Sequence, residues 1–178
     1  MNDKSDSALV KDCLSGNKKS FEELVERYTK PVFNVALRII NNYDDAAEIV
    51  QTTFIKAFEN LHSFDTKRKF FSWIYRIATN ESLNYLKARK QHDQLSEEHV
   101  SYEQTPAEKI DSEETDQQLQ DALMQLSPDY RIVLVLCHFQ NLSYKEIGSI
   151  LDLPEKTVKS RLFSARKNLK GILEREDI

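Results

Sequence analysis

The chain has 178 residues and a formal net charge of −4; charged residues make up 30% of it and hydrophobic residues 40%, with only three Gly and four Pro. A composition so poor in turn-forming residues favours an all-α soluble protein of one or two small domains over a sheet protein. No apolar run approaches the roughly 18 residues that a membrane span needs. The first residues lead into no apolar signal core, so we expect a cytoplasmic protein without membrane insertion.

Two isolated cysteines, Cys13 and Cys137, provide neither a disulfide framework nor the spacing of a zinc site. We interpret both as small core residues. The net negative charge, taken alone, argues against a protein that binds nucleic acid.

The distribution of charge along the chain reverses that conclusion. Seven basic residues stand against one acid within 67–90, and six basic residues stand without any acid within 156–170. The segment 93–121 carries ten acids and one base. The acidity is therefore concentrated between two basic patches.

The N-terminal half of the chain reads as a series of helices. Apolar residues recur at helical spacing, and we expect Ser7 to cap the first helix and Asp44 the third. Pro31 interrupts the second apolar stripe and is expected to kink or split that helix. A loop at 64–69 then precedes a long helix over 71–90.

The segment 92–114 lacks apolar periodicity, is rich in acids, Gln and Ser, and includes Pro106. This composition predicts a flexible acidic linker. The chain therefore divides into two small helical domains, at 1–91 and 115–178.

The second domain has the pattern of a helix-turn-helix. Ser143 is placed to cap a short helix over 144–151, and the tight turn 152–154 precedes a long basic helix. Such a helix fits a major groove, where Arg pairs with guanine edges and Lys or Ser reaches bases or phosphates. The alternative is an amphipathic helix with an ordinary solvated basic face. The candidate residues for duplex DNA are Lys156, Thr157, Lys159, Ser160, Arg161, Ser164 and Arg166.

Aromatic residues alternate with basic ones in the first patch, a combination that suits single-stranded nucleic acid because rings stack on bases while cations follow the backbone. The alternative is that many of these rings are core residues, and Phe70, Ile74 and Ile77 have the spacing of buried positions. Trp73 and the loop before it are the strongest candidates for contact with unpaired bases.

Three acids, Asp44, Asp45 and Glu48, stand beside Gln51 on one expected helix. They raise the alternatives of a metal site or an acid–base pair, but no nearby His or Gly-rich loop supports such chemistry. A solvated acidic face, or a docking face for a basic partner, fits the composition better.

Four stretches stand in one order along the chain: FEELVERY at 21–28, DAAEIVQTTF at 45–54, FSWIYRIATN at 71–80, and LSYKEI at 142–147 with TVKSRL at 157–162. In this order and spacing they resemble the group IV, or extracytoplasmic-function, sigma factors of the sigma-70 family. The resemblance runs from about Ala8 to Leu173, apart from the linker. It implies a sigma-2-like helical bundle, a sigma-4-like helix-turn-helix, and a subunit that directs promoter-specific transcription initiation without catalysis, cofactor or metal.

The resemblance also implies roles for individual residues. The residues docking onto the clamp helices of the largest subunit of core RNA polymerase would be Asp45, Glu48, Gln51 and Phe54. The residues at the −10 element, where the loop captures a flipped base, would be Phe64, Lys67, Arg68, Phe71, Trp73, Arg76 and Asn80. The last helix would read the −35 element of the promoter as duplex DNA.

Further partners follow from the same resemblance. They are the polymerase flap, an RNA path of the polymerase that the acidic linker would thread, and an anti-sigma protein that holds the factor inactive. Asp152 stands where the family commonly has a turn Gly, and Asp tolerates the left-handed backbone expected there. The chain offers no sign of a fused sensor domain, and we expect none.

Two other classes of function stay open at this point. A free-standing helix-turn-helix regulator would bind duplex DNA tightly without polymerase, usually at a two-fold site. An enzyme using the carboxylates of Asp44, Asp45 and Glu48 would need a second ligand cluster, which is not recognisable in the sequence.

Overall fold

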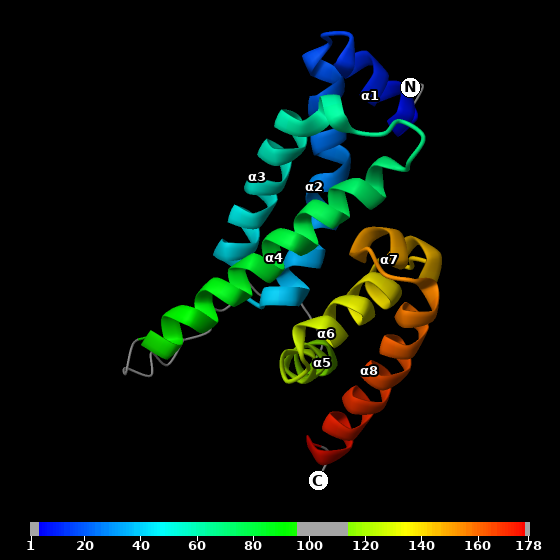
Figure 1. Cartoon of the computed structure of the whole chain (residues 1–178). Coiled ribbons are helices and arrows are strands. Elements are labelled where there is room, and N and C mark those ends of the chain that lie inside the picture. The colour runs from blue at the N-terminus through cyan, green and yellow to red at the C-terminus, as the bar shows by residue number, and fades with distance from the viewer. Residues whose placement is uncertain (1–3, 96–113, 177–178) are drawn as a thin grey trace.

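The computed structural model describes residues 4–95 and 114–176. Within these ranges the chain consists of helices and connecting turns, with no strand. Helices α1 to α4 form an N-terminal bundle and helices α5 to α8 form a C-terminal bundle (Figure 1). The predicted all-α fold with two helical units is thereby confirmed. Most of the predicted linker lies outside the described residues, while 92–95 continue the helix before it.

The N-terminal bundle packs three long helices beneath a short one. Leu9, Leu24, Ile39 and Ile74 are fully buried in its core, one or more from each of α1, α2 and α4. The elements are α1 (Asp6–Leu14), α2 (Lys18–Ile40), α3 (Tyr43–Asn60), the 3-10 turn η1 (Leu61–Ser63) and α4 (Phe70–Leu95).

The C-terminal bundle is smaller, and its buried residues belong to the same hydrophobic cluster as those of the N-terminal bundle. Leu123, Leu136, Ile147 and Leu162 are fully buried there. Its elements are α5 (Glu114–Met124), α6 (Pro128–Leu134), a π-helical turn η2 (Val135–Phe139), α7 (Tyr144–Leu151) and α8 (Glu155–Glu176).

Two predicted caps in the N-terminal bundle are wrong, and of the two expectations at Pro31, a kink or a split, the split does not occur. Ser5, not Ser7, caps α1, because Ser5 has the extended backbone and its Oγ accepts from the N–H of Ala8. Asn42, not Asp44, caps α3 in the same way, with its Oδ1 3.0 Å from the Asp45 nitrogen. Helix α2 is not split at Pro31 but continues for nine more residues, since its apolar stripe stays buried on both sides of the proline.

The turn between α7 and α8 is formed as expected and is tightly packed. Ser143 and Glu146 make a reciprocal capping box at the start of α7, and Asp152 ends the helix with a left-handed φ of 57°. The Leu153 N–H then donates to the Gly148 carbonyl at 2.9 Å. A Cβ at Gly148 would lie 2.6 Å from the Leu153 carbonyl oxygen, so only glycine allows this close approach.

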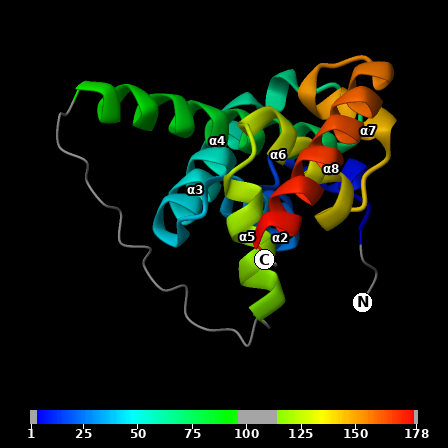
Figure 2. The ribbon, with the colours of Figure 1, turned by 90° about the horizontal axis from the view of Figure 1, so that it is seen from below.

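The two bundles lie against each other. Figures 1 and 2 show the C-terminal helices gathered along one side of α2 and α4, while α3 lies on the other side. Arg131 of α6, only 4% exposed, connects the two bundles through its hydrogen bonds. Its guanidinium donates to the carbonyls of Leu123, Met124 and Leu126 in its own bundle and to that of Ile39 at the end of α2.

We predict that Gly148→Ala lowers the free energy of unfolding by about 1–3 kcal/mol, because the added methyl group forces the turn between α7 and α8 apart. Thermal unfolding followed by circular dichroism measures the change. Gly171→Ala on α8 is the matched control, since a Cβ there meets nothing within 4 Å. Equal losses in the two variants would contradict the packing argument.

Candidate nucleic-acid interface

One face of α8 is open and basic. Val158, Leu162 and Ala165 turn into the core of the C-terminal bundle and fix the rotation of the helix. At 100° per residue, the opposite stripe carries exposed side chains. They are Lys156, Lys159, Ser160, Phe163 and Lys167. We name this stripe the α8 face.

The predicted duplex-binding residues divide into two groups. Lys156, Lys159 and Ser160 lie together on the α8 face, while Thr157 and Ser164 are half-buried at its flank. Arg161 lies beside the buried stripe, with its guanidinium 3.5 Å from the carboxylate of Asp129. The structure therefore brings fewer of these side chains onto one open surface than the sequence predicted.

The side chain of Arg166 contacts the π-helical turn η2 and is not part of the α8 face. Its Nε lies 3.2 Å from His138 Nε2, and its Nη2 lies 3.7 Å from Cys137 Sγ. Burial, aided by the Arg166 charge, lowers the pKa of His138, and a neutral imidazole nitrogen accepts the bond that Arg166 donates.

Phe163 is the residue on the α8 face that sequence analysis missed. Its side chain is 72% exposed, more than any other large hydrophobic side chain of the described residues. The signal was present: Phe163 follows Lys159 by four positions and Ser160 by three, which places all three on one face. A planar apolar ring at this point suits contact with the methyl group of thymine in a major groove.

The aromatic residues after α3 form a cluster between core and surface. Phe64 and Phe70 are buried, and Trp73 packs between them with ring centroids 5.0 and 5.8 Å away. Phe64 therefore supports the loop from inside. Trp73 is half-buried and Phe71 likewise, so part of each ring remains accessible. Burial fixes the orientation of this cluster before any ligand arrives.

A cavity of about 380 Å³ opens beside this cluster. The loop contributes the basic residues Lys67 and Arg68, and the beginning of α4 contributes the aromatic ring of Phe71. The other wall of the cavity is the beginning of α1, with Ser5 and Ser7. A cavity with cations, a ring and hydroxyl groups offers both stacking and hydrogen bonds to one unpaired base. Sequence analysis assigned no role to α1.

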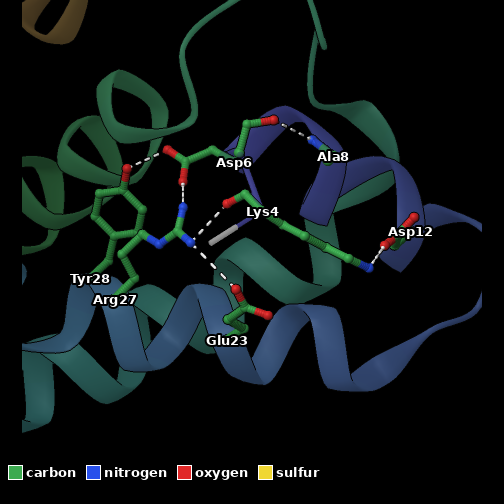
Figure 3. Close-up of polar contacts among 8 residues, drawn as sticks. Lys4, Asp6, Ala8, Asp12, Glu23, Arg27 and Tyr28 are labelled. Atoms are coloured by element: carbon green, nitrogen blue, oxygen red, sulfur yellow. Dashed lines mark hydrogen bonds and ion pairs between the residues drawn. The ribbon is translucent and has the colours of Figure 1, made fainter. Parts of the chain in front are cut away.

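An ion-paired clamp holds α1 in this position (Figure 3). The carboxylate of Asp6 accepts from Arg27 at 2.5 Å and from the hydroxyl of Tyr28. Arg27 also donates to the Lys4 carbonyl at 2.9 Å. Burial, then the bond to Asp6, raises the pKa of Tyr28, so the phenol stays a donor at neutral pH. The Tyr28 ring in turn packs 5.4 Å from Phe70, which connects the clamp to the aromatic cluster.

Arg76 and Asn80 extend the basic surface along α4. Together with Trp73 they recur at spacings of three and four, so they share one side of the helix. Arg76 lies 3.2 Å from Asp152 of the C-terminal bundle, and Asn80 is exposed. Lys67 and Arg68 are exposed in the loop, with Arg68 3.7 Å from Asp65.

The outer side of α3 combines charge with exposed apolar surface. Glu48 and Gln51 are exposed, whereas Asp45 accepts a hydrogen bond from Tyr85 and Phe54 is only 7% exposed in the core. One stripe, which we name the α3 face, consists of Glu48, Gln51, Ile55 and Phe58. Sequence analysis gave neither Ile55 nor Phe58 a role on this surface, and these residues are 57% and 50% exposed. Exposed aliphatic and aromatic side chains next to an acid are typical of a surface for a protein partner.

Family models match both bundles. The model of Sigma-70 region 2 matches residues 24–92, and that of Sigma-70 region 4 matches residues 116–169. The chain belongs to the sigma-70 family of sigma factors. The relatives place it in the extracytoplasmic-function (ECF) group of that family. It is 33% identical to an ECF RNA polymerase sigma-E factor of Haemophilus influenzae, with 96% of each chain covered. It is 32% identical to the ECF RNA polymerase sigma factor SigW of Bacillus subtilis, with 90% of this chain and 92% of that one covered.

Solved structures of similar sigma factors share the arrangement of the helices. CnrH in complex with the cytosolic domain of CnrY matches 97% of this chain and 99% of its own, with a TM-score of 0.74 and 26% identity. RpoE in complex with the anti-sigma factor NepR from Bartonella quintana matches 88% of this chain and 98% of its own, with a TM-score of 0.71 and 26% identity.

Family membership decides among the three classes of function that the sequence left open. This sigma factor is a transcription initiation factor, and sigma factors as a family bind core RNA polymerase and promoter DNA and are not enzymes. Within the described ranges, no three His, Cys, Asp or Glu side chains gather closely enough to hold a metal ion. None of the helices in those ranges has the length and apolarity needed to span a bilayer.

The match to region 2 begins at residue 24, so α1 lies before it. The position of α1 against the loop is therefore a feature that the family model does not describe, and it depends on the Asp6 clamp.

We predict that Asp6→Asn lowers the free energy of unfolding by about 1–3 kcal/mol, because it weakens bonds to both Arg27 and Tyr28 in a half-buried site. Asp12→Asn on the same helix is the control: its pair with Lys4 is exposed, and its loss should change stability by less than about 0.5 kcal/mol. Thermal melts of both variants measure the difference. If the Asp6 clamp does not contribute to stability, Asp6→Asn and Asp12→Asn will have the same melting temperature.

Proposed function

We propose that this sigma factor reads the −35 element with the α8 face, captures an unpaired base of the −10 element in the cavity between α1 and the loop, and docks on core polymerase through the α3 face. The observation that carries the proposal is the cavity, because it joins stacking rings, cations and hydroxyl groups at one end of the N-terminal bundle. The chain contributes promoter recognition and strand opening and no catalytic step of its own. It acts in the cytoplasm, where its polymerase works.

The assignment of the −10 element rests on three properties of the N-terminal bundle. The cavity is preformed, since buried Phe64 and Phe70 hold its aromatic wall. Lys67 and Arg68 stand exposed at its edge, where they can follow a phosphate backbone. Unstacking a base costs a few kcal/mol by order of magnitude, and a preformed pocket offsets this cost without any further ordering of the protein.

The assignment of core docking rests on the α3 face. Glu48 and Gln51 provide the polar contacts that the sequence predicted, and Ile55 and Phe58 provide an apolar centre. Phe54 takes no direct part in this arrangement, since it supports α3 from the core. The clamp helices of the largest subunit are the partner that the family resemblance implies.

Two further partners are part of the proposal. An apolar groove of about 560 Å³ lies between α5, α6 and α8, and its lining includes Leu119, Leu134 and Leu169. This groove would bind a segment of the polymerase flap. An anti-sigma protein is inferred because a similar solved sigma factor, RpoE from Bartonella quintana, is bound to an anti-sigma factor.

Reconstitution with core polymerase tests the proposal as a whole. Promoters are first identified by mapping transcription start sites after overexpression. The purified chain should then bind core enzyme and direct runoff transcription from those promoters. Tight binding to duplex DNA without polymerase, together with no association with core, would instead indicate a free-standing regulator.

For the α8 face, we predict that Phe163→Ala weakens binding of holoenzyme to a −35 duplex on the order of tenfold, because a thymine methyl contact is lost. Lys159→Ala should weaken binding to all sequences and reduce its salt dependence, as expected for a phosphate contact. Lys30→Ala, an exposed lysine on α2, is the control for charge. Fluorescence anisotropy measures all three. Unchanged affinity of Phe163→Ala would show that a different face reads the duplex.

For the α3 face, we predict that Ile55→Ser combined with Glu48→Lys weakens binding to core polymerase by at least tenfold, because it removes both the apolar and the charged contact. The matched control is Glu22→Lys, the same charge reversal at an exposed position of α2. Surface plasmon resonance on immobilised core enzyme measures the affinity. Equal binding of variant and control would place the docking surface elsewhere.

A further inference from the structure

The beginning of α1 forms one wall of the base cavity, and the rotation of this helix is fixed. Leu9 and Val10 are fully buried and hold α1 against the rest of the N-terminal bundle. Ser7 precedes Val10 by three residues, so the two share one side of the helix, and both line the cavity. Ser7 itself is exposed. The burial of its neighbours therefore holds the Ser7 hydroxyl at the cavity without covering it.

The acid among the residues that line the cavity is Asp6, and its carboxylate is engaged by α2 (Figure 3). One carboxylate oxygen accepts from Arg27, and the other accepts from the hydroxyl of Tyr28. Each oxygen thus already has a strong donor. Asp6 is therefore a poor acceptor for a base, although it positions the wall that would contact one.

The two serines of this wall differ in what their hydroxyl groups do. The Ser5 oxygen accepts from the Ala8 N–H and caps α1. Ser7 lies in the first turn of the helix, and neither the cap nor the Asp6 clamp uses its hydroxyl. Of the two, Ser7 has the hydroxyl group that is available to a ligand in the cavity.

The cavity offers more donors than acceptors to the edge of a base. Among its lining residues, Lys67 and Arg68 can only donate, whereas the hydroxyl groups of Ser7 and Thr66 can donate or accept. The Watson–Crick edges of thymine, cytosine and guanine each carry a carbonyl oxygen. Adenine presents an amino group and a ring nitrogen instead. A donor-rich cavity therefore favours a base with a carbonyl oxygen over adenine.

We propose that Ser7 of α1 is a specificity-determining residue of the −10 site, whose hydroxyl donates to a carbonyl oxygen of the captured base and so selects against adenine. The inference rests on the proposed capture of an unpaired −10 base in this cavity. Every base offers a face for stacking, so the aromatic rings supply affinity and the polar groups at the base edge supply the choice. Because α1 precedes the match to region 2, which begins at residue 24, Ser7 adds a contact from outside that match.

Holoenzyme and a set of synthetic non-template strands test the role of Ser7. The captured position is first found as the one at which an abasic site weakens binding of the wild-type holoenzyme most. Strands with each of the four bases at this position, and with the abasic site, are then compared by fluorescence anisotropy. We expect Ser7→Ala to weaken binding of thymine, cytosine or guanine strands about three- to tenfold, the effect of one hydrogen bond, and to leave the adenine and abasic strands unchanged.

Two further variants separate the hydroxyl group from other effects of the change. Ser7→Thr keeps the hydroxyl and should retain the base preference of the wild type. Ser15→Ala makes the same substitution at the other end of α1, away from the cavity lining, and should bind every strand as the wild type does. Because Ser7 is exposed and takes no part in the cap, the melting temperature of Ser7→Ala should equal that of the wild type.

Two results would overturn the proposal. Unchanged affinity of Ser7→Ala for all strands would show that its hydroxyl does not contact the base. An equal loss on every strand, the abasic one included, would show that Ser7 acts on the DNA backbone or on the fold. The failure of the proposed function looks different and would overturn both: no position of the −10 strand would then respond to an abasic site, even with the wild-type holoenzyme.

Discussion

The guanidinium of Arg131 is the group on which the arrangement of the whole chain depends. Burial lowers its pKa to about 10, yet it remains charged at neutral pH and must be satisfied by hydrogen bonds. Its partners are all backbone carbonyls, mostly at the ends of helices, where the helix dipole favours a cation. Three of them organise the turn from α5 to α6, so most of the cost of burying this charge is offset within the C-terminal bundle. The fourth, at Ile39, extends the same charge network to the end of α2 in the N-terminal bundle.

Each proposed binding surface is held in place by side chains of its own bundle. The α8 face is positioned by a buried stripe on the same helix, and the base cavity by buried rings and by the Asp6 clamp. None of these supports crosses from one bundle to the other. The contacts that do cross include ion pairs, side-chain hydrogen bonds, capped carbonyls and the contact of Arg38 with the Phe139 ring, and the buried apolar residues of both bundles form one hydrophobic cluster. The contact between the bundles is therefore both polar and apolar.

Sequence reasoning predicted best where the signal was local. The cap at Ser143, the short helix after it and the left-handed Asp152 depend on a few neighbouring residues, and they were found in the expected places. Cap positions failed where two candidates stood close together, as with Ser5 and Ser7, because the choice depends on which residue has extended backbone. Arg161 and Phe54 show a different limit. Their residue types suit a binding surface, but the rotation of each helix, set by its whole apolar stripe, buries Phe54 and places Arg161 at the flank of the open face beside Asp129.

The contacts between the bundles lay beyond sequence reasoning for a further reason. Lys69 and Glu146 are separated by 77 positions, and many other cations and acids in the chain are equally good partners by charge alone. This pair is selected by the shape of the two bundles and by the capping of α2. The spacing of apolar residues along the sequence reveals neither of these.

The net charge of −4, which at first argued against a DNA-binding protein, then has a physical role. A net negative charge opposes nonspecific association with DNA, while the basic side chains of the α8 face remain exposed as a local positive surface. On the polymerase, the two bundles act from one support, and the high effective concentration of the second site compensates for the weakness of each. On the proposed function, specific binding therefore depends on the partner that holds both sites on one support, because neither site has to bind tightly by itself.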